Sequence, residues 1–159
     1  MIYPSNFEQR VGFDRIREQI MDRCSMLSSR QRIASEGFSR SLREVTERLE
    51  LADQMRQVIL LEPGAEIGEQ EDIRTIVDKV AVEGSYLTAE ECATLWRSLR
   101  NASTIVRFIL SRKAESYPAL QRITRNVETC PHLQSAIERV VDDKGEVRSS
   151  ASPELSQLR

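Results

Sequence analysis

The sequence contains few of the residues from which catalytic and metal-binding sites are built. Its 159 residues include a single histidine, His132, and three cysteines, Cys24, Cys92 and Cys130. The cysteines are odd in number and widely spaced, so they match no zinc-binding pattern and are expected to be reduced thiols. The sequence also lacks a glycine-rich loop that could cradle a phosphate, so it predicts no bound nucleotide. We therefore expect no catalytic residue, no metal, no cofactor and no enzymatic activity in this chain.

Long hydrophobic runs are absent as well. No stretch approaches the roughly 20 apolar residues that a helix needs to cross a bilayer. The first four residues, MIYP, do not begin the basic and then apolar pattern of a secretory signal peptide. These absences predict a cytoplasmic protein that makes no contact with a membrane.

The sequence has no excess of positive charge. Its net charge is −2 and its pI is about 5.6, which argues against strong autonomous DNA binding. The basic feature that stands out is a set of three arginines, Arg97, Arg100 and Arg107, within about a quarter-turn of each other on a predicted helix. They form either a phosphate-contacting face or, as is commoner, a solvated face. Trp96, at the margin of that helix, is expected to pack rather than to stack on bases.

The residues that are present favour helix. Apolar residues make up 40% of the chain and charged residues 30%, with six glycines and five prolines. This composition is that of a globular domain tilted towards helix. Helix starts are marked by three pairs with the spacing of a capping box. These pairs are Ser5 with Glu8, Ser41 with Glu44, and Thr88 with Glu91. We predict an all-α fold that forms a single domain over residues 1–159.

The spacing of apolar residues places the helices. The helix after Ser41 is predicted to carry a stripe of Leu42, Val45, Leu49, Ala52, Met55 and Ile59. The longest helix, from Thr88 to about Lys113, has an apolar face of Cys92, Leu95, Leu99, Ala102, Val106 and Ile109. Shorter helices are expected near residues 5–12, 14–24, 28–33 and 73–80, with Asp14 and Ser28 at the start of the second and third. Residues 133–140 are expected to form a further helix or an apolar segment. Residues 62–70 are predicted to form a loop.

The last 20 residues carry two further signals. In segment 140–148, apolar residues flank an acidic turn with a glycine, which predicts one small β-hairpin near the C-terminus. Ser152 then precedes Pro153 and Glu154, the order that begins a helix. Because a helix of one or two turns is not stable alone, we expect this segment to be the start of a longer helix and the chain to be a fragment.

Taken together, the motifs resemble a known family. The first group comprises YPSNFE at 3–8, VGFDRIR at 11–17 and Cys24. The second comprises EDIR at 71–74 and VEGSYLTAEE at 82–91, and the third DDKGEVR at 142–148 and ASPEL at 151–155. In order and spacing they resemble the N-terminal region of the bacterial MutS paralogues. This branch lacks the mismatch-reading domains and usually carries a C-terminal Smr nuclease domain.

The resemblance implies a role for the segment and for the protein around it. The segment would be the start of the helical core and lever, a structural element without catalysis. The full protein would be a DNA-binding, homodimeric ATPase of the ABC class in DNA mismatch repair or recombination control. A second family-level possibility is action on stalled ribosomes. A third, from another class, is a helical protein-interaction module that makes no contact with nucleic acid.

Overall fold

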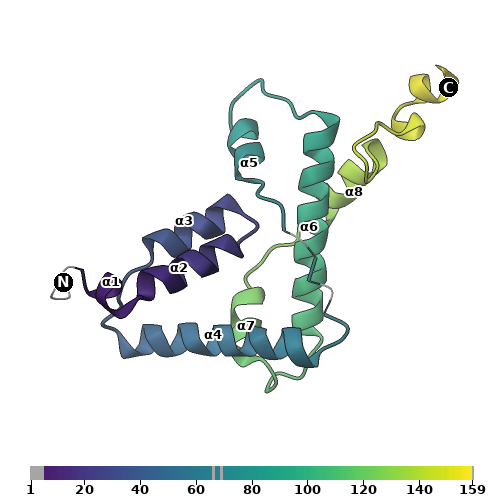
Figure 1. Ribbon diagram of the computed structural model, residues 1–159. Coiled ribbons are helices and arrows are strands. Elements are labelled where there is room, and N and C mark those ends of the chain that lie inside the picture. Colours follow the sequence, from purple (N-terminus) through teal and green to yellow (C-terminus); the bar gives the residue numbers. More distant parts are fainter. Residues whose placement is uncertain (1–5, 66, 69, 159) are drawn as a thin grey trace. The chain divides into compact units, whose positions relative to one another are not determined.

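The computed structural model describes residues 6–65, 67–68 and 70–158, and the regular elements within these ranges are all helical (Figure 1). The all-α prediction is confirmed. In the described ranges, no helix is long and apolar enough to span a membrane. In chain order the elements are α1 (Phe7–Val11), α2 (Phe13–Asp22), α3 (Leu27–Ser35), α4 (Leu42–Leu61), α5 (Arg74–Val80), α6 (Ala89–Leu110), α7 (Pro118–Thr124), α8 (Pro131–Val140), a 3₁₀ turn η1 (Ser149–Ala151) and α9 (Pro153–Leu158).

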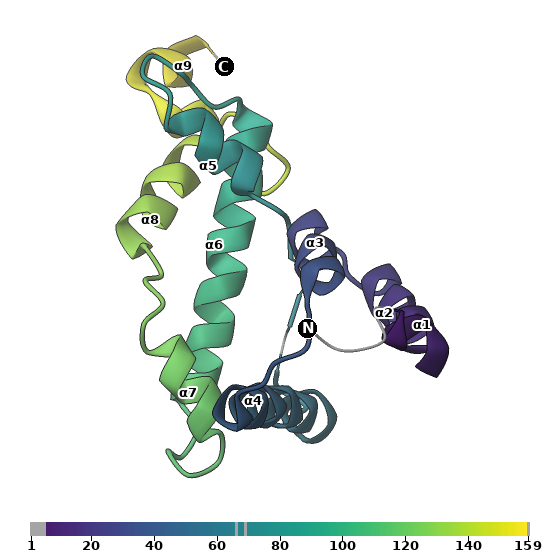
Figure 2. The ribbon, with the colours of Figure 1, turned by 90° about the vertical axis from the view of Figure 1, so that its left-hand side faces the viewer.

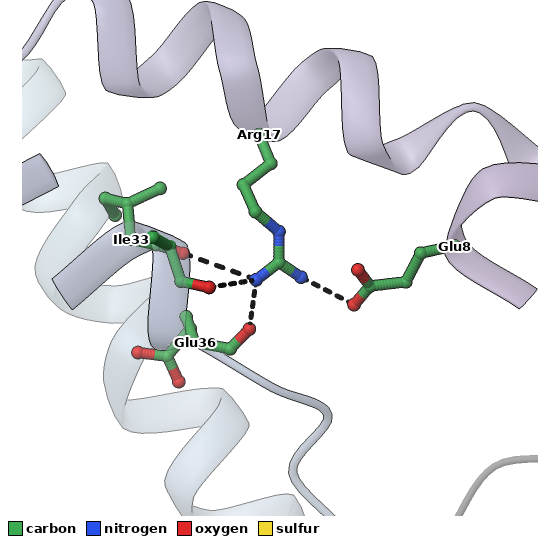
Figure 3. Close-up of polar contacts among 5 residues, drawn as sticks. Glu8, Arg17, Ile33 and Glu36 are labelled. Atoms are coloured by element: carbon green, nitrogen blue, oxygen red, sulfur yellow. Dashed lines mark hydrogen bonds and ion pairs between the residues drawn. The ribbon is translucent and has the colours of Figure 1, made fainter. Parts of the chain in front are cut away.

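The chain divides into two compact units, of which the smaller contains α1, α2 and α3. Arg17 of α2 holds this unit together, as Figure 3 shows. Its guanidinium donates to the carbonyl oxygens of Ile33, Ala34 and Glu36 at the end of α3, and it forms an ion pair with Glu8 of α1. Helix ends leave carbonyls without partners, and a cation is favoured there by the helix dipole. Arg17 therefore caps α3 and ties it to α1 and α2.

Two helix starts in this unit differ from the sequence-based expectation. Asp14 does not cap α2. The N-cap residue of α2 is Gly12, which has a left-handed conformation with φ 71°, and no side chain caps the helix. One carboxylate oxygen of Asp14 is instead buried without a hydrogen-bond partner. Ser5, expected to cap α1, lies outside the described residues, and Glu8 pairs with Arg17 rather than completing a capping box.

The start of α3 is stabilised from a distant part of the chain. The helix begins at Leu27, one residue before the expected Ser28. The backbone N–H of Ser28 donates to a carboxylate oxygen of Asp72 at 3.0 Å. An acidic side chain 44 positions away thus acts as the cap, which no local pattern could indicate.

The larger unit contains α4 to α9. Ser41 caps α4, as predicted, by accepting the backbone N–H of Glu44 at 3.3 Å. The predicted apolar stripe packs inside only in part: Met55 lies against the buried cluster, whereas Leu42 is 81% exposed and Leu49 is 65% exposed. The buried side of α4 centres on Val58, which is 1% exposed. This side of α4 packs against α7 (Figure 2).

The helix α6 has a complete capping box at its start, formed by Thr88 and Glu91 as predicted. Two separate hydrophobic clusters lie along it. Near its N-terminus, Ala93 packs with Ile137 of α8 and Val141. Near its C-terminus, Ile109 packs with residues of α4 and α7 and of the segment before α7, namely Val58, Tyr117 and Leu120. The two clusters place α8 against one part of α6 and α4 and α7 against another (Figures 1 and 2).

The predicted β-hairpin is wrong as a pair of strands. Segment 140–148 forms a turn closed by one antiparallel bridge between Val141 and Val147, and there is no strand within the described ranges. Five residues, 142–146, lie between the two bridged valines, and α8 and η1 flank the turn at Val140 and Ser149, so the pairing does not extend into a ladder. The predicted helix start is confirmed, since Ser152 Oγ accepts the N–H of Leu155 at 3.2 Å.

Candidate nucleic-acid interface

Arg97 is the first of the three arginines predicted to form a basic face on α6. Its guanidinium donates to the carbonyl oxygen of Asp143 at 3.0 Å and to the hydroxyl oxygen of Thr94 at 3.1 Å. The residue is half-buried. The bond to Asp143 joins α6 to the turn that follows α8. Arg97 therefore contributes to the packing of this turn, whatever else it contacts.

Arg100 lies on the exposed side of α6 and stacks on a neighbouring ring. The central carbon of its guanidinium is 5.1 Å from the centre of the Trp96 ring. A cation–π contact at an exposed site is worth about 0.5–1 kcal/mol. Trp96 itself is half-buried and packs against the cluster of Ala93, Ile137 and Val141, so the interpretation of Trp96 as a packing residue is confirmed.

Arg107 is exposed in the last turn of α6. Among the residues that the structure describes, no hydrogen bond or ion pair engages its guanidinium. The three arginines therefore differ in their surroundings: Arg97 binds a turn, Arg100 covers a tryptophan and Arg107 faces solvent. That these three arginines form a phosphate-contacting face stays a prediction.

The turn that Arg97 contacts is organised by Asp142. Its carboxylate accepts the backbone N–H groups of Glu146 at 2.8 Å and Lys144 at 3.0 Å. The hydrogen bond from the backbone of Glu146 is the largest of the effects that hold the pKa of Asp142 below its ordinary value of 3.8. Gly145 adopts φ +84°, and a Cβ there would lie 3.2 Å from the Cα of Glu90. The turn thus lies close against the first turn of α6.

A glutamine of α4 caps α7. The side-chain oxygen of Gln54 accepts the backbone N–H of Ala119 at 2.9 Å and that of Leu120 at 3.1 Å. These donors have no partner within α7 because they belong to its first turn. Tyr117, the residue at the N-cap, makes no side-chain cap. Gln54 therefore replaces a local cap and joins α4 to α7.

A second glutamine acts at the C-terminal end of α6, where it donates to carbonyl oxygens. The side-chain nitrogen of Gln121 on α7 lies within hydrogen-bond distance of three carbonyl oxygens. These belong to Ile109 at 3.3 Å, Arg112 at 3.0 Å and Lys113 at 3.2 Å. Gln121 is 4% exposed, so its amide satisfies carbonyls that solvent does not reach freely.

An ionic group completes this region. Glu62, which follows α4, accepts the hydroxyl of Tyr117 at 3.0 Å and pairs with Arg112 at 3.1 Å. The guanidinium of Arg112 lies 4.1 Å from the centre of the Phe108 ring. Burial, and then the carboxylate of Glu62, raise the pKa of Tyr117.

We call Gln54, Glu62, Arg112, Tyr117 and Gln121 the polar joint, since these five side chains connect the ends of α4, α6 and α7. Sequence reasoning missed all five as positioning residues. Its contacts are hydrogen bonds and one ion pair that join these three helices.

The described residues include no group of three histidine, cysteine, aspartate or glutamate side chains that could hold a metal ion. Cys24, Cys92 and Cys130 are free thiols. Burial, with a smaller effect of the neighbouring Glu91, raises the pKa of Cys92, which keeps this thiol in its less reactive protonated form.

Comparison with known proteins identifies relatives that include several endonucleases MutS2. Endonuclease MutS2 of Pelotomaculum thermopropionicum is 30% identical over 151 residues, which are 95% of this chain and 19% of the relative. Endonuclease MutS2 of Thermomicrobium roseum is 30% identical over 153 residues, and that of a Geobacillus species is 27% identical over 151 residues. Both alignments cover 94% of this chain and 19% of the relative.

The chain therefore spans about 19% of the length of these curated relatives. No family model matches it. No solved structure matches it.

Proposed function

We propose that this chain, which is homologous over about 95% of its length to a region of endonuclease MutS2, a MutS paralogue, is a non-catalytic structural segment of a MutS-like ATPase. The single observation that carries the proposal is this homology, which extends over nearly the whole chain in relatives of the same name. The homology bears out the resemblance inferred from the sequence motifs.

The protein that contains the segment acts, on this proposal, on DNA in the bacterial cytoplasm as a homodimer, in mismatch repair or recombination control. The relatives are named endonucleases, which supports a nucleic acid as the substrate of the whole protein. Action on stalled ribosomes is the alternative that the family resemblance leaves open.

The segment transmits conformational change within that protein. Its α6, at about 1.5 Å per residue, is roughly 33 Å long and carries separate clusters near its two ends. The polar joint fixes α4 and α7 to its C-terminal part, and Arg97 fixes the turn after α8 to its N-terminal part. A helix held at both ends can pass a displacement of one end to the other, which is the role of a core and lever element.

One observation favours a second function, that of a protein-interaction module. The outer side of α4 exposes large apolar side chains, among them Leu42, Leu49 and Ile59. Exposed apolar patches often mark contacts with other proteins. Both functions can hold for one segment, because a structural element of a larger protein must pack against its neighbours.

Calorimetric titration of the 159-residue chain with Mg-ATP tests the proposal. We expect neither binding nor hydrolysis, since the sequence has no phosphate-binding loop. A nuclease assay on supercoiled DNA, run in parallel, should show no cleavage. Micromolar affinity for ATP or cleavage above that of a mock-purified sample would contradict the assignment as a non-catalytic segment.

A further inference from the structure

A groove lies between the α6–α7 turn and α7. It is open to solvent and has a volume of about 490 Å³. The residues that line it are Ala114, Pro118, Gln121, Arg122, Arg125 and Asn126. Three of these side chains, Arg122, Arg125 and Asn126, are exposed and carry hydrogen-bond donors. The groove is therefore rich in hydrogen-bond donors, and two of the three donor side chains, Arg122 and Arg125, are permanent cations.

The helix that carries the arginines is fixed on its other side. Ala119, Leu120, Gln121 and Thr124 of α7 are all buried. Gln121 binds the carbonyls at the end of α6, and the N-terminus of α7 is capped by Gln54. The backbone under Arg122 and Arg125 is thus held by the polar joint. The backbone positions from which these two side chains extend are therefore fixed, as a binding site requires.

The charge around the groove is opposite to that of the chain. The residues that line the groove include two cations and no carboxylate. Segment 107–128, to which they belong, contains five cationic side chains and two carboxylates, and one of the cations, Arg112, is paired with Glu62 outside the segment. The whole chain has a net charge of −2. The cations are Arg107, Arg112, Lys113, Arg122 and Arg125, and the carboxylates are Glu115 and Glu128. In the part of the chain that the structure describes, neither Arg122 nor Arg125 forms an ion pair. Their charges are therefore available to an anion from outside the chain.

We propose that this groove binds the phosphate backbone of a nucleic acid through Arg122 and Arg125, with Asn126 as a further donor. The inference rests on the proposed function and names a contact surface for it. Guanidinium groups bind phosphate oxygens through two parallel hydrogen bonds, and such contacts position a nucleic acid without reading its sequence. A cation is favoured at the C-terminus of a helix, and this effect explains why Arg125 follows α7. It does not explain the groove beside Arg125.

Fluorescence anisotropy with the 159-residue chain and a short labelled oligonucleotide tests the inference. Single-stranded DNA, duplex DNA and RNA of one sequence are compared. We expect wild-type dissociation constants of about 10⁻⁴ to 10⁻⁶ M, the range of non-specific binding. Each lost phosphate contact lowers the salt slope by about 0.9. Between about 50 and 200 mM salt, the wild type should therefore lose about tenfold more affinity than the double variant Arg122→Ala/Arg125→Ala.

The control variant is Arg10→Ala/Arg15→Ala, which removes the same charge from exposed positions of the smaller unit. It should keep the wild-type salt slope, and Arg122→Lys/Arg125→Lys should keep most of the slope as well. Circular dichroism melts of all variants check that they fold. The inference is overturned if the wild type fails to bind at low salt, if both double alanine variants behave alike, or if an acidic polyglutamate peptide binds as tightly as the oligonucleotide. The proposed function is tested separately, by ATP titration and a nuclease assay, and none of these outcomes changes the result of that test.

Discussion

Replacing Ile109 with alanine should lower the free energy of unfolding of the larger unit by about 2–5 kcal/mol. Ile109 is 2% exposed and forms a cluster with Val58, Tyr117 and Leu120. The existing cavity beside it holds only about 10 Å³, so the packing around this side chain is close. Truncation removes buried methyl groups and leaves a void that neighbouring helices cannot fill completely. Urea denaturation followed by circular dichroism measures the effect.

The matched control for Ile109 is Leu110→Ala on the same helix. Leu110 is 41% exposed, so its truncation should change the free energy of unfolding much less. Both substitutions introduce alanine, which has a high helix propensity, so a loss of helix propensity does not account for a difference between the two variants. Equal effects of the two substitutions would show that the cluster around Ile109 is not the core of this unit.

Replacing Gln121 with glutamate should destabilise the chain at pH 7 by about 2–4 kcal/mol, more than replacing it with alanine. The native amide donates towards three carbonyl oxygens, whereas an ionised carboxylate of nearly the same volume can only accept. The buried carboxyl should therefore have a raised pKa in the folded state. Its penalty is full above that pKa and disappears as pH falls below about 4.3, the value in the unfolded chain.

Urea denaturation of Gln121→Glu at a series of pH values tests this expectation. The difference in stability between the variant and the wild type should shrink as pH falls. Gln19→Glu, at an exposed position of α2, is the control and should change stability little at any pH. A Gln121→Glu penalty that is independent of pH would show that the amide is not a donor to these carbonyls.

Helix starts could be predicted from sequence where the cap is local. Thr88 with Glu91, Ser41 and Ser152 each act on an N–H three residues away, as the patterns indicated. The cap of α3 by Asp72 and the cap of α7 by Gln54 come from distant positions. The sequence shows only that the start of α7, after Tyr117, lacks a capping residue of its own and needs an acceptor from elsewhere.

The buried face of α4 could not be predicted from periodicity. Apolar residues lie on two sides of this helix, and the stripe through Leu42 and Leu49 is the longer one. The structure buries the side around Val58, which includes Met55 of that stripe but not Leu42 or Leu49, because α7 and the C-terminal part of α6 pack there. Hydrophobic spacing identifies the helix, but which side faces inward depends on contacts with distant segments.

The candidate site shows the same limit. Helical geometry placed Arg97, Arg100 and Arg107 on one side of α6, and that placement needed only the sequence. The bond from Arg97 to Asp143 spans 46 positions and depends on how α8 packs. Likewise, the turn at Asp142 and Gly145 was recognisable from sequence, while the pairing around it is limited to one bridge between Val141 and Val147.

The central proposal, that this segment transmits change without performing chemistry, is tested most directly in a full-length MutS2-like protein that carries this sequence. The measurement is ATP hydrolysis with and without nucleic acid for Tyr117→Phe, which removes the hydroxyl bonded to Glu62 in the polar joint. Tyr86→Phe is the control, since Tyr86 is 78% exposed. We predict an unchanged rate without nucleic acid and a weaker response to nucleic acid for Tyr117→Phe alone. A loss of hydrolysis in the absence of nucleic acid, or an unaltered response, would contradict the claim.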